Sequence, residues 1–132
     1  MAFLIHTTDD GRIPPFEYLP AAAITPKIGM ALTQSDGNLA IATGTTKPSY
    51  ICMTQRDAAL TAGDIIPVIR VEPDIVFETE FSAAASSIKI GNKVTLHASD
   101  GMSVTATTTN GVAEIVYMDG TVSGSMCRVR FA

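Results

Sequence analysis

From residue 28 onward, the chain consists of short runs in which apolar and polar residues alternate. In residues 126–131, Cys127, Val129 and Phe131 fall on one face of a strand and the polar positions fall on the other. The runs predict strands at residues 28–33, 38–43, 49–54, 64–71, 74–80, 92–97, 102–108, 112–118 and 125–131. Turn dipeptides that supply a positive φ separate several of them: Asp36-Gly37, Asp100-Gly101, Asn110-Gly111 and Asp119-Gly120. This spacing is typical of an all-β barrel or sandwich.

Helical patterns are short and few. Residues 55–61 end close to Gly63, which is a suitable C-terminal glycine, and residues 81–87 are rich in Ala and Ser. We therefore expect at most short helices beside the strands.

Residues 1–26 differ from the rest of the chain because they hold Pro14, Pro15, Pro20 and Pro26, four of the seven prolines. Proline removes backbone donors, so this segment is neither a central strand nor a helix interior. It is also rich in apolar residues, which a disordered tail normally lacks. Two interpretations remain: an extended arm that docks on a partner, or an edge strand that packs along its own domain.

A sequence motif occurs twice. Lys27-Ile28-Gly29 precedes Ser35-Asp36-Gly37, and Lys89-Ile90-Gly91 precedes Ser99-Asp100-Gly101, each with β-rich runs after it. We therefore divide the chain into an arm, residues 1–26, and an all-β domain, residues 27–132. Within that domain, residues 27–71 and 89–131 are candidates for two similar β-meanders.

The composition limits the classes of partner. The chain has 132 residues, of which 46% are hydrophobic and 17% are charged, so we expect part of its apolar surface to be covered by a partner or by copies of itself. The net charge of −4 argues against nucleic acid as a partner. No apolar run has the length of a membrane span, and residues 3–5 are too short for the core of a signal peptide, so we expect no membrane partner and synthesis in a cytoplasm.

Candidate chemistry is sparse, and we expect no enzyme, no cofactor and no metal site. His6 and His97 have no Cys or His neighbour at metal-binding spacing. Ser99 and Asp100 adjoin His97, but neighbouring residues on a strand point to opposite faces, which disfavours a catalytic triad. Cys52 and Cys127 lie in predicted strands and are interpreted as buried free thiols.

Acidic residues gather between residues 72 and 80, namely Glu72, Asp74, Glu78 and Glu80. Paired carboxylates serve acid–base chemistry or calcium binding, but no EF-hand spacing is present, and we interpret the cluster as a solvated strand face that protects a sheet edge. Arg128 and Arg130 project from one face of the last strand, and we interpret that face as solvated.

The apolar residues of the first segment are the candidate contact site. An extended segment adds a strand to an exposed sheet edge, and aromatic residues tend to dominate the energy of an interface. Phe16 and Tyr18 are the candidate anchors. The full candidate set is Phe3, Leu4, Ile5, Pro14, Pro15, Phe16, Tyr18 and Leu19.

Behind this proline-rich segment comes a series of short motifs: Ile28-Gly29-Met30-Ala31-Leu32, Asp36-Gly37, Ala42-Thr43-Gly44-Thr45, Tyr50-Ile51-Cys52-Met53, Ala62-Gly63-Asp64 and the run from Ile65 to Val71. This order resembles the head decoration, or capsid cement, proteins of tailed bacteriophages of the lambda type, mainly over residues 24–80. The chain departs from that pattern by its length and by the β-rich section at residues 88–132. No individual functional residue is carried over.

The resemblance implies a β-tulip-like fold, an arm that orders on the capsid, the major capsid protein as partner, and self-association with a trimer favoured over a monomer. It also implies a location on the outside of the virion head after synthesis in the bacterial host. Two alternatives remain open. One is another phage structural component, in the tail or baseplate; the other is a small β-barrel ligand-binding module or enzyme with Glu72, Asp74 and His97 around a pocket.

Overall fold

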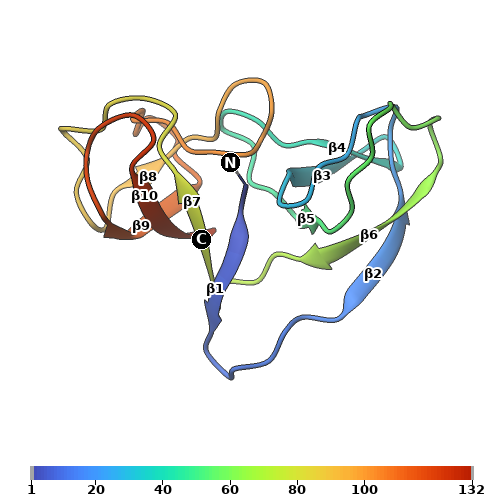
Figure 1. Ribbon diagram of the computed structural model, residues 1–132, viewed down its shortest axis with the longest axis horizontal. Coiled ribbons are helices and arrows are strands. Elements are labelled where there is room, and N and C mark those ends of the chain that lie inside the picture. Colours follow the sequence, from blue (N-terminus) through green and yellow to red (C-terminus); the bar gives the residue numbers. More distant parts are fainter. Residues whose placement is uncertain (1, 132) are drawn as a thin grey trace.

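Two antiparallel sheets of five strands each make up the computed structural model, which describes residues 2–131. The first sheet has the order β1-β7-β10-β9-β8 and the second the order β2-β6-β5-β3-β4. Figure 1 shows the two sheets as two lobes that lie side by side. In the first sheet, called sheet A, the strands are β1 (Leu4–Thr8), β7 (Ile75–Glu80), β10 (Met126–Phe131), β9 (Ala113–Met118) and β8 (Lys93–Val94). In the second, called sheet B, they are β2 (Phe16–Pro20), β6 (Ile65–Arg70), β5 (Tyr50–Cys52), β3 (Ala31–Ser35) and β4 (Asn38–Ile41).

The all-β prediction is confirmed, but neither expected helix forms within residues 2–131. In both segments the backbone N–H groups bond to distant carbonyls instead of to the preceding turn. Leu60 N–H donates to Ile24 C=O at 2.8 Å, and Ala85 N–H donates to Thr121 C=O at 2.7 Å. Tertiary pairing therefore overrides the weak helical pattern of these short segments.

The predicted strand at residues 102–108 is wrong. Val104 alone makes isolated bridges there, to Phe81 and Leu96. Side chains occupy neighbouring backbone groups: Thr107 N–H donates to Thr105 Oγ1 at 3.0 Å, and Met102 N–H donates to Asp100 Oδ1 at 3.1 Å. Such local bonds compete with a sheet ladder, and here they hold a loop.

The repeated Lys-Ile-Gly motif forms the same turn in both halves of the chain. Each glycine has a positive φ, 86° at Gly29 and 96° at Gly91, which a glycine adopts without steric cost. Each turn closes with one hydrogen bond and then pairs with a distant strand, β5 in the first half and β9 in the second. The bonds of the first turn are Met30 N–H to Lys27 C=O, Gly29 N–H to Cys52 C=O and Cys52 N–H to Met30 C=O. Those of the second are Asn92 N–H to Lys89 C=O, Gly91 N–H to Ile115 C=O and Ile115 N–H to Asn92 C=O.

A second pair of turns also repeats. Gly63 N–H donates to Ala21 C=O, and Gly124 N–H donates to Phe81 C=O, both at 2.8 Å. The strand order β2-β6-β5-β3 in sheet B therefore matches β7-β10-β9-β8 in sheet A. In each half, the residue that follows the matching strand, β2 or β7, also forms a parallel bridge to a later segment. Ala21 bridges to Leu39 in one half, and Phe81 bridges to Val104 in the other.

The first segment of the chain supplies one strand to each sheet. β1 pairs with β7 and β2 pairs with β6, both antiparallel and both at a sheet edge. Edge positions tolerate the prolines, because those backbone nitrogens donate to no ladder. The structure therefore has the edge-strand arrangement that the sequence left open, and residues 4–8 and 16–20 do not form a free arm in the isolated chain.

Two clusters of buried side chains form the core, and the larger one joins the two halves. The smaller lies within sheet B, and the larger combines sheet A with the outer face of sheet B, through Ala31, Ile51 and Ile69. Phe3 joins the larger cluster, with its ring centroid 5.2 Å from that of Phe131. Phe77 lies 5.5 Å from the other side of Phe131, so aromatic packing fastens the start of the chain to its last strand.

The two Ser-Asp-Gly motifs have different roles. Asp36 and Gly37, with φ of 52° and 83°, form the two-residue hairpin turn between β3 and β4 that the sequence predicts. Gly101 instead lies against sheet B, where its carbonyl accepts a hydrogen bond of 2.9 Å from Ala31 N–H. The second motif therefore connects the lobes, and it lies in the longer loop between the antiparallel-bridged Leu96 and Val104 instead of in a two-residue turn.

Candidate interaction surface

The structure divides the predicted contact residues into buried and exposed groups. Phe3 is only 1% exposed and lies in the core, so its assignment as a contact residue is corrected. Ile5 packs partly against the same core, and Leu19 packs partly against the core of sheet B. The members that remain exposed are Leu4, Pro15, Phe16 and Tyr18, with Pro14 half-buried.

The exposed members form two separate surfaces because β1 and β2 belong to different sheets. We call the first the β1 edge surface. It contains Leu4, which is 53% exposed, and Ile13 from the loop that follows the strand. Leu4 and Met126 border a hollow of about 200 Å³, and Ile5 and Ile13 border another of about 280 Å³.

The second is the β2 edge surface, which contains Phe16, Tyr18, Ile65 and Pro67. Tyr18 is 66% exposed and pairs with Pro67 of β6. On the opposite face of β2, Glu17 binds Arg70 through two hydrogen bonds of 2.9 and 3.0 Å, and this bond raises the pKa of the Arg70 guanidinium. The strand thus has an apolar face beside a charge-paired face.

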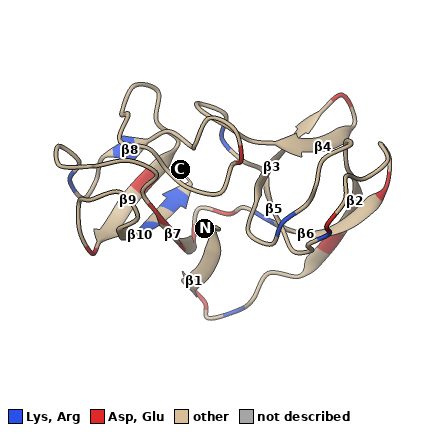
Figure 2. Ribbon diagram, turned by 45° about the horizontal axis from the view of Figure 1, so that its top comes forward, with Lys and Arg blue, Asp and Glu red and all other residues tan. Residues whose placement is uncertain are grey.

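Charged side chains pair across the strands of sheet A. Arg128 Nε lies 3.2 Å from Glu78 Oε2, and His6 Nδ1 lies 3.7 Å from the same oxygen. Arg128 also stacks over the Tyr117 ring at 4.7 Å. The sequence placed Glu78 and Arg128 on solvated faces but gave no sign that the two face each other, since their strands are 50 residues apart. Figure 2 shows Lys and Arg interspersed with Asp and Glu over both lobes.

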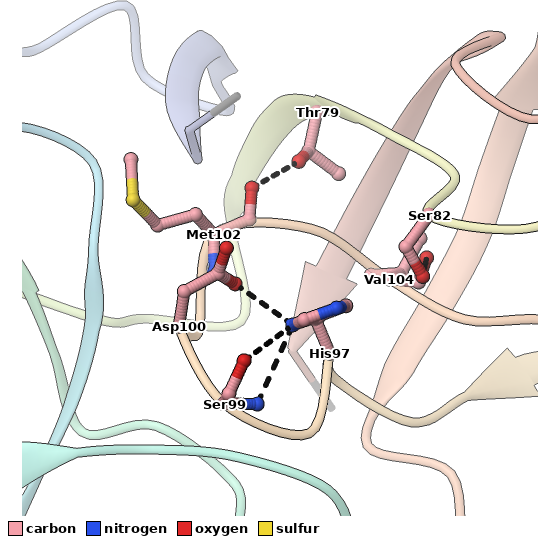
Figure 3. Close-up of polar contacts among 7 residues, drawn as sticks. All are labelled: Thr79, Ser82, His97, Ser99, Asp100, Met102 and Val104. Carbon is pink, nitrogen blue, oxygen red and sulfur yellow. Dashed lines mark hydrogen bonds and ion pairs between the residues drawn. The ribbon is translucent and has the colours of Figure 1, made fainter.

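The His97 turn brings three polar side chains together without forming a catalytic relay (Figure 3). Asp100 Oδ1 lies 3.1 Å and Ser99 Oγ lies 3.3 Å from the same ring nitrogen, Nδ1. A base that activates a nucleophile needs the serine and the carboxylate on different nitrogens. Asp100 Oδ1 also accepts the N–H of Met102, and Thr79 Oγ1 donates to Met102 C=O at 3.2 Å, so this turn fastens its loop to β7.

The residues of the ligand-binding alternative do not converge. Glu72 borders a hollow of about 380 Å³ together with Lys47 and Arg70. The His97 turn borders a different hollow through Ser99 and Asp100. Within residues 2–131, no group of three or more His, Cys, Asp or Glu side chains has metal-binding geometry, and no helix is long and apolar enough to span a membrane.

Both cysteines are buried and free. Burial raises the pKa of Cys52, and an interaction with the backbone of Thr54 offsets part of that rise. Burial, with a smaller contribution from the charge of Glu80, raises the pKa of Cys127 to about 12. Both thiols are therefore protonated and inert at neutral pH.

A thiol-reactivity measurement checks this state. At pH 8, we expect Cys127 to react with a disulfide reagent roughly a hundredfold more slowly in the folded protein than in urea, because only the thiolate attacks, and we expect Cys52 to react more slowly as well. Since the folded pKa of Cys127 exceeds its unfolded value, the free energy of unfolding should fall as the pH rises above about 9. Rapid reaction of either thiol in the folded protein would contradict the buried assignment.

No protein-family model matches the chain, and no curated protein is significantly similar to it.

Proposed function

We propose that the protein is a capsid decoration (cement) protein of a tailed bacteriophage, which binds the outside of the assembled head and bridges major capsid protein subunits. The observation that carries the proposal is the β1 edge surface: an edge strand with exposed apolar side chains between two hollows. An edge strand offers main-chain hydrogen bonds to an extended partner segment, and the hollows offer room for its side chains.

A decoration protein needs contacts that repeat over the capsid shell. Each contact can be weak, because many copies together stabilise the head through multivalency. Self-association belongs to the proposal for the same reason, since linked copies bind neighbouring subunits at a high effective concentration. The low charge content and the apolar edges favour such structural contacts.

Co-sedimentation with heads tests the proposal. The protein should bind expanded heads of the phage that encodes it, saturably and at a fixed ratio to the major capsid protein. Replacing Leu4 and Ile13 by Asp should weaken binding by about tenfold or more, because burial of one large aliphatic side chain contributes about 1.5–3 kcal/mol. Val122→Asp is the matched control, because Val122 is 69% exposed and its side chain borders neither hollow.

Three outcomes would count against the proposal. Binding to tails and not to heads would assign the protein to the tail or baseplate. Binding to neither heads nor tails would favour the ligand-binding module instead. Equal binding by the Leu4/Ile13 double variant and the Val122 control would remove the β1 edge surface from the contact.

A further inference from the structure

The outer faces of the two sheets can be compared position by position, because the two halves share their turns and strand order. One row on the outer face of sheet B crosses β3, β5 and β6 and consists of Ala31, Ile51 and Ile69. The row of sheet A that crosses β8, β9 and β10 consists of Lys93, Glu114 and Arg130. The two rows are equivalent, because in each half the glycine of the Lys-Ile-Gly turn donates its N–H to the carbonyl of the residue that follows the middle member.

A second row lies beside the first on each face. In sheet B it is Tyr18 opposite Pro67, on β2 and β6. In sheet A it is Glu78 opposite Arg128, on β7 and β10. Tyr18 and Glu78 each stand three residues before the residue that forms the parallel bridge of its half, so these rows are equivalent as well.

Charged side chains on sheet A stand where sheet B has apolar ones. The first row of sheet A alternates in sign, and Figure 2 shows blue on β8, red on β9 and blue on β10. In the second row, Arg128 Nε lies 3.2 Å from Glu78 Oε2. Cross-strand charge pairs support a sheet while they face water, so this face needs no cover. The fold therefore does not require apolar side chains at the matching positions of sheet B.

The second half of the chain covers only part of the apolar face of sheet B. The first row of that face is at most 1% exposed and belongs to the larger core. Met53 packs partly against this core and donates its N–H to Pro67 C=O, so the β2 edge surface continues directly from the contact between the lobes. On that surface Tyr18 is 66%, Ile65 53% and Phe16 46% exposed. It is the uncovered remainder of a face that the protein buries elsewhere.

We propose that the β2 edge surface packs face to face against the same surface of a second copy, about a two-fold axis near Tyr18 and Pro67. Facing sheets lie about 10 Å apart and interdigitate their side chains, so the contact needs no main-chain pairing. The bridge between Ala21 and Leu39, which places β4 beside the end of β2, therefore stays in place.

An uncharged surface favours a second copy as the partner. In a two-fold contact, a charged side chain near the axis meets its own like, which is repulsive. The members of the β2 edge surface carry no charge, and Glu17 lies on the opposite face of β2, where it is bound to Arg70. The same packing through sheet A would have to desolvate Glu78 and Arg128, at a cost that an ion pair rarely repays.

The composition of the surface also fits an interface between proteins. The centres of such interfaces are rich in aromatic residues and poor in charged ones. Phe16 and Tyr18 of the two copies bring four rings together, and contacts between aromatic rings add stability beyond the area that they bury. The β2 edge surface therefore has the chemistry of an interface centre.

The contact is isologous and gives a dimer, whereas the resemblance found in the sequence implies a trimer. It covers Phe16 and Tyr18, which leaves the β1 edge surface for the capsid shell. Both partners are copies of this chain, so the contact forms whether or not the protein binds a capsid.

Light scattering on the purified full chain tests the contact. The surface is small, so we expect a modest affinity and a mass that rises from one chain towards two over a series from about 1 µM to about 1 mM. Tyr18→Glu should keep the mass of one chain throughout, because its carboxylate would be buried beside its like. Ile90→Glu is the matched control and should still dimerise, because Ile90 is 65% exposed on the turn before β8 in the other sheet.

A double variant separates the contact from the fold. Tyr18→Glu together with Pro67→Arg transfers the Glu78–Arg128 pair to the equivalent positions of sheet B, so the chain should keep its circular dichroism and remain single. Four results would overturn the inference: a single-chain mass of the unchanged protein throughout the series, a three-chain mass, a double variant that dimerises normally, or an Ile90→Glu variant that loses the dimer.

Cross-linking locates the axis. Tyr18→Cys should be joined to its copy by a short bifunctional maleimide, because the facing sheets lie about 10 Å apart. The background should be low, since Cys52 and Cys127 are buried. Ile90→Cys should remain a single chain on a denaturing gel. Equal cross-linking of the two variants, or none by Tyr18→Cys with unchanged circular dichroism, would exclude the contact.

Discussion

Replacing Phe3 by Ala is expected to lower the free energy of unfolding by about 3–5 kcal/mol, the usual cost of removing a fully buried phenylalanine. The ring lies in the larger core and packs edge-to-face against Phe131. Its loss leaves a cavity between the first segment and the last strand. The same substitution in a free arm would leave the stability of the domain unchanged.

Leu4→Ala is the matched control for this prediction. The two residues are neighbours, but Leu4 points to solvent, so its replacement should change the free energy of unfolding by less than about 0.5 kcal/mol. Urea unfolding followed by circular dichroism measures both values. If the two variants are equally stable, β1 is not part of the folded core in solution.

Gly101→Ala is expected to lower the free energy of unfolding by about 2–5 kcal/mol. Gly101 has a φ of 60°, and a side chain in this left-handed region costs about 1–2 kcal/mol. An added Cβ would also lie 2.6 Å from Ala42 C=O, which forces the lobes apart at about 1–3 kcal/mol more.

Gly37→Ala separates the two contributions. Gly37 has a φ of 83° and sits in the same tripeptide motif, but an added Cβ would meet nothing within 4 Å. The free energy of unfolding of this variant should therefore fall only by the cost of its backbone conformation, about 1–2 kcal/mol. Equal losses in the two glycine variants, measured by thermal and urea unfolding, would show that Gly101 does not connect the lobes tightly.

Local patterns predicted most strands, because alternation reports directly which side chains of a strand face the core. The hairpin at Asp36-Gly37 was predictable for the same local reason, since its two residues supply the φ values that the turn needs. Which strand lies beside which was not predictable. β1 pairs with β7, whose residues lie 67 to 74 positions later in the chain, and no local signal identifies such a partner.

The candidate contact residues were predictable only by composition. Phe3 and Leu4 are equally apolar, yet one is buried and the other exposed. Strand alternation places Phe3 and Ile5 together and Leu4 on the other face, but it does not say which face meets the core.

The placement of β1 also affects the order of events during synthesis. Every strand of sheet B has been synthesised once Arg70 is added, so this lobe is free to pair its strands before sheet A is complete. β1 is synthesised before all of them, yet its neighbour β7 comes after sheet B, and β10 comes later still. The first strand of the chain is therefore among the last to find its place, and its apolar side chains stay accessible to chaperones throughout translation.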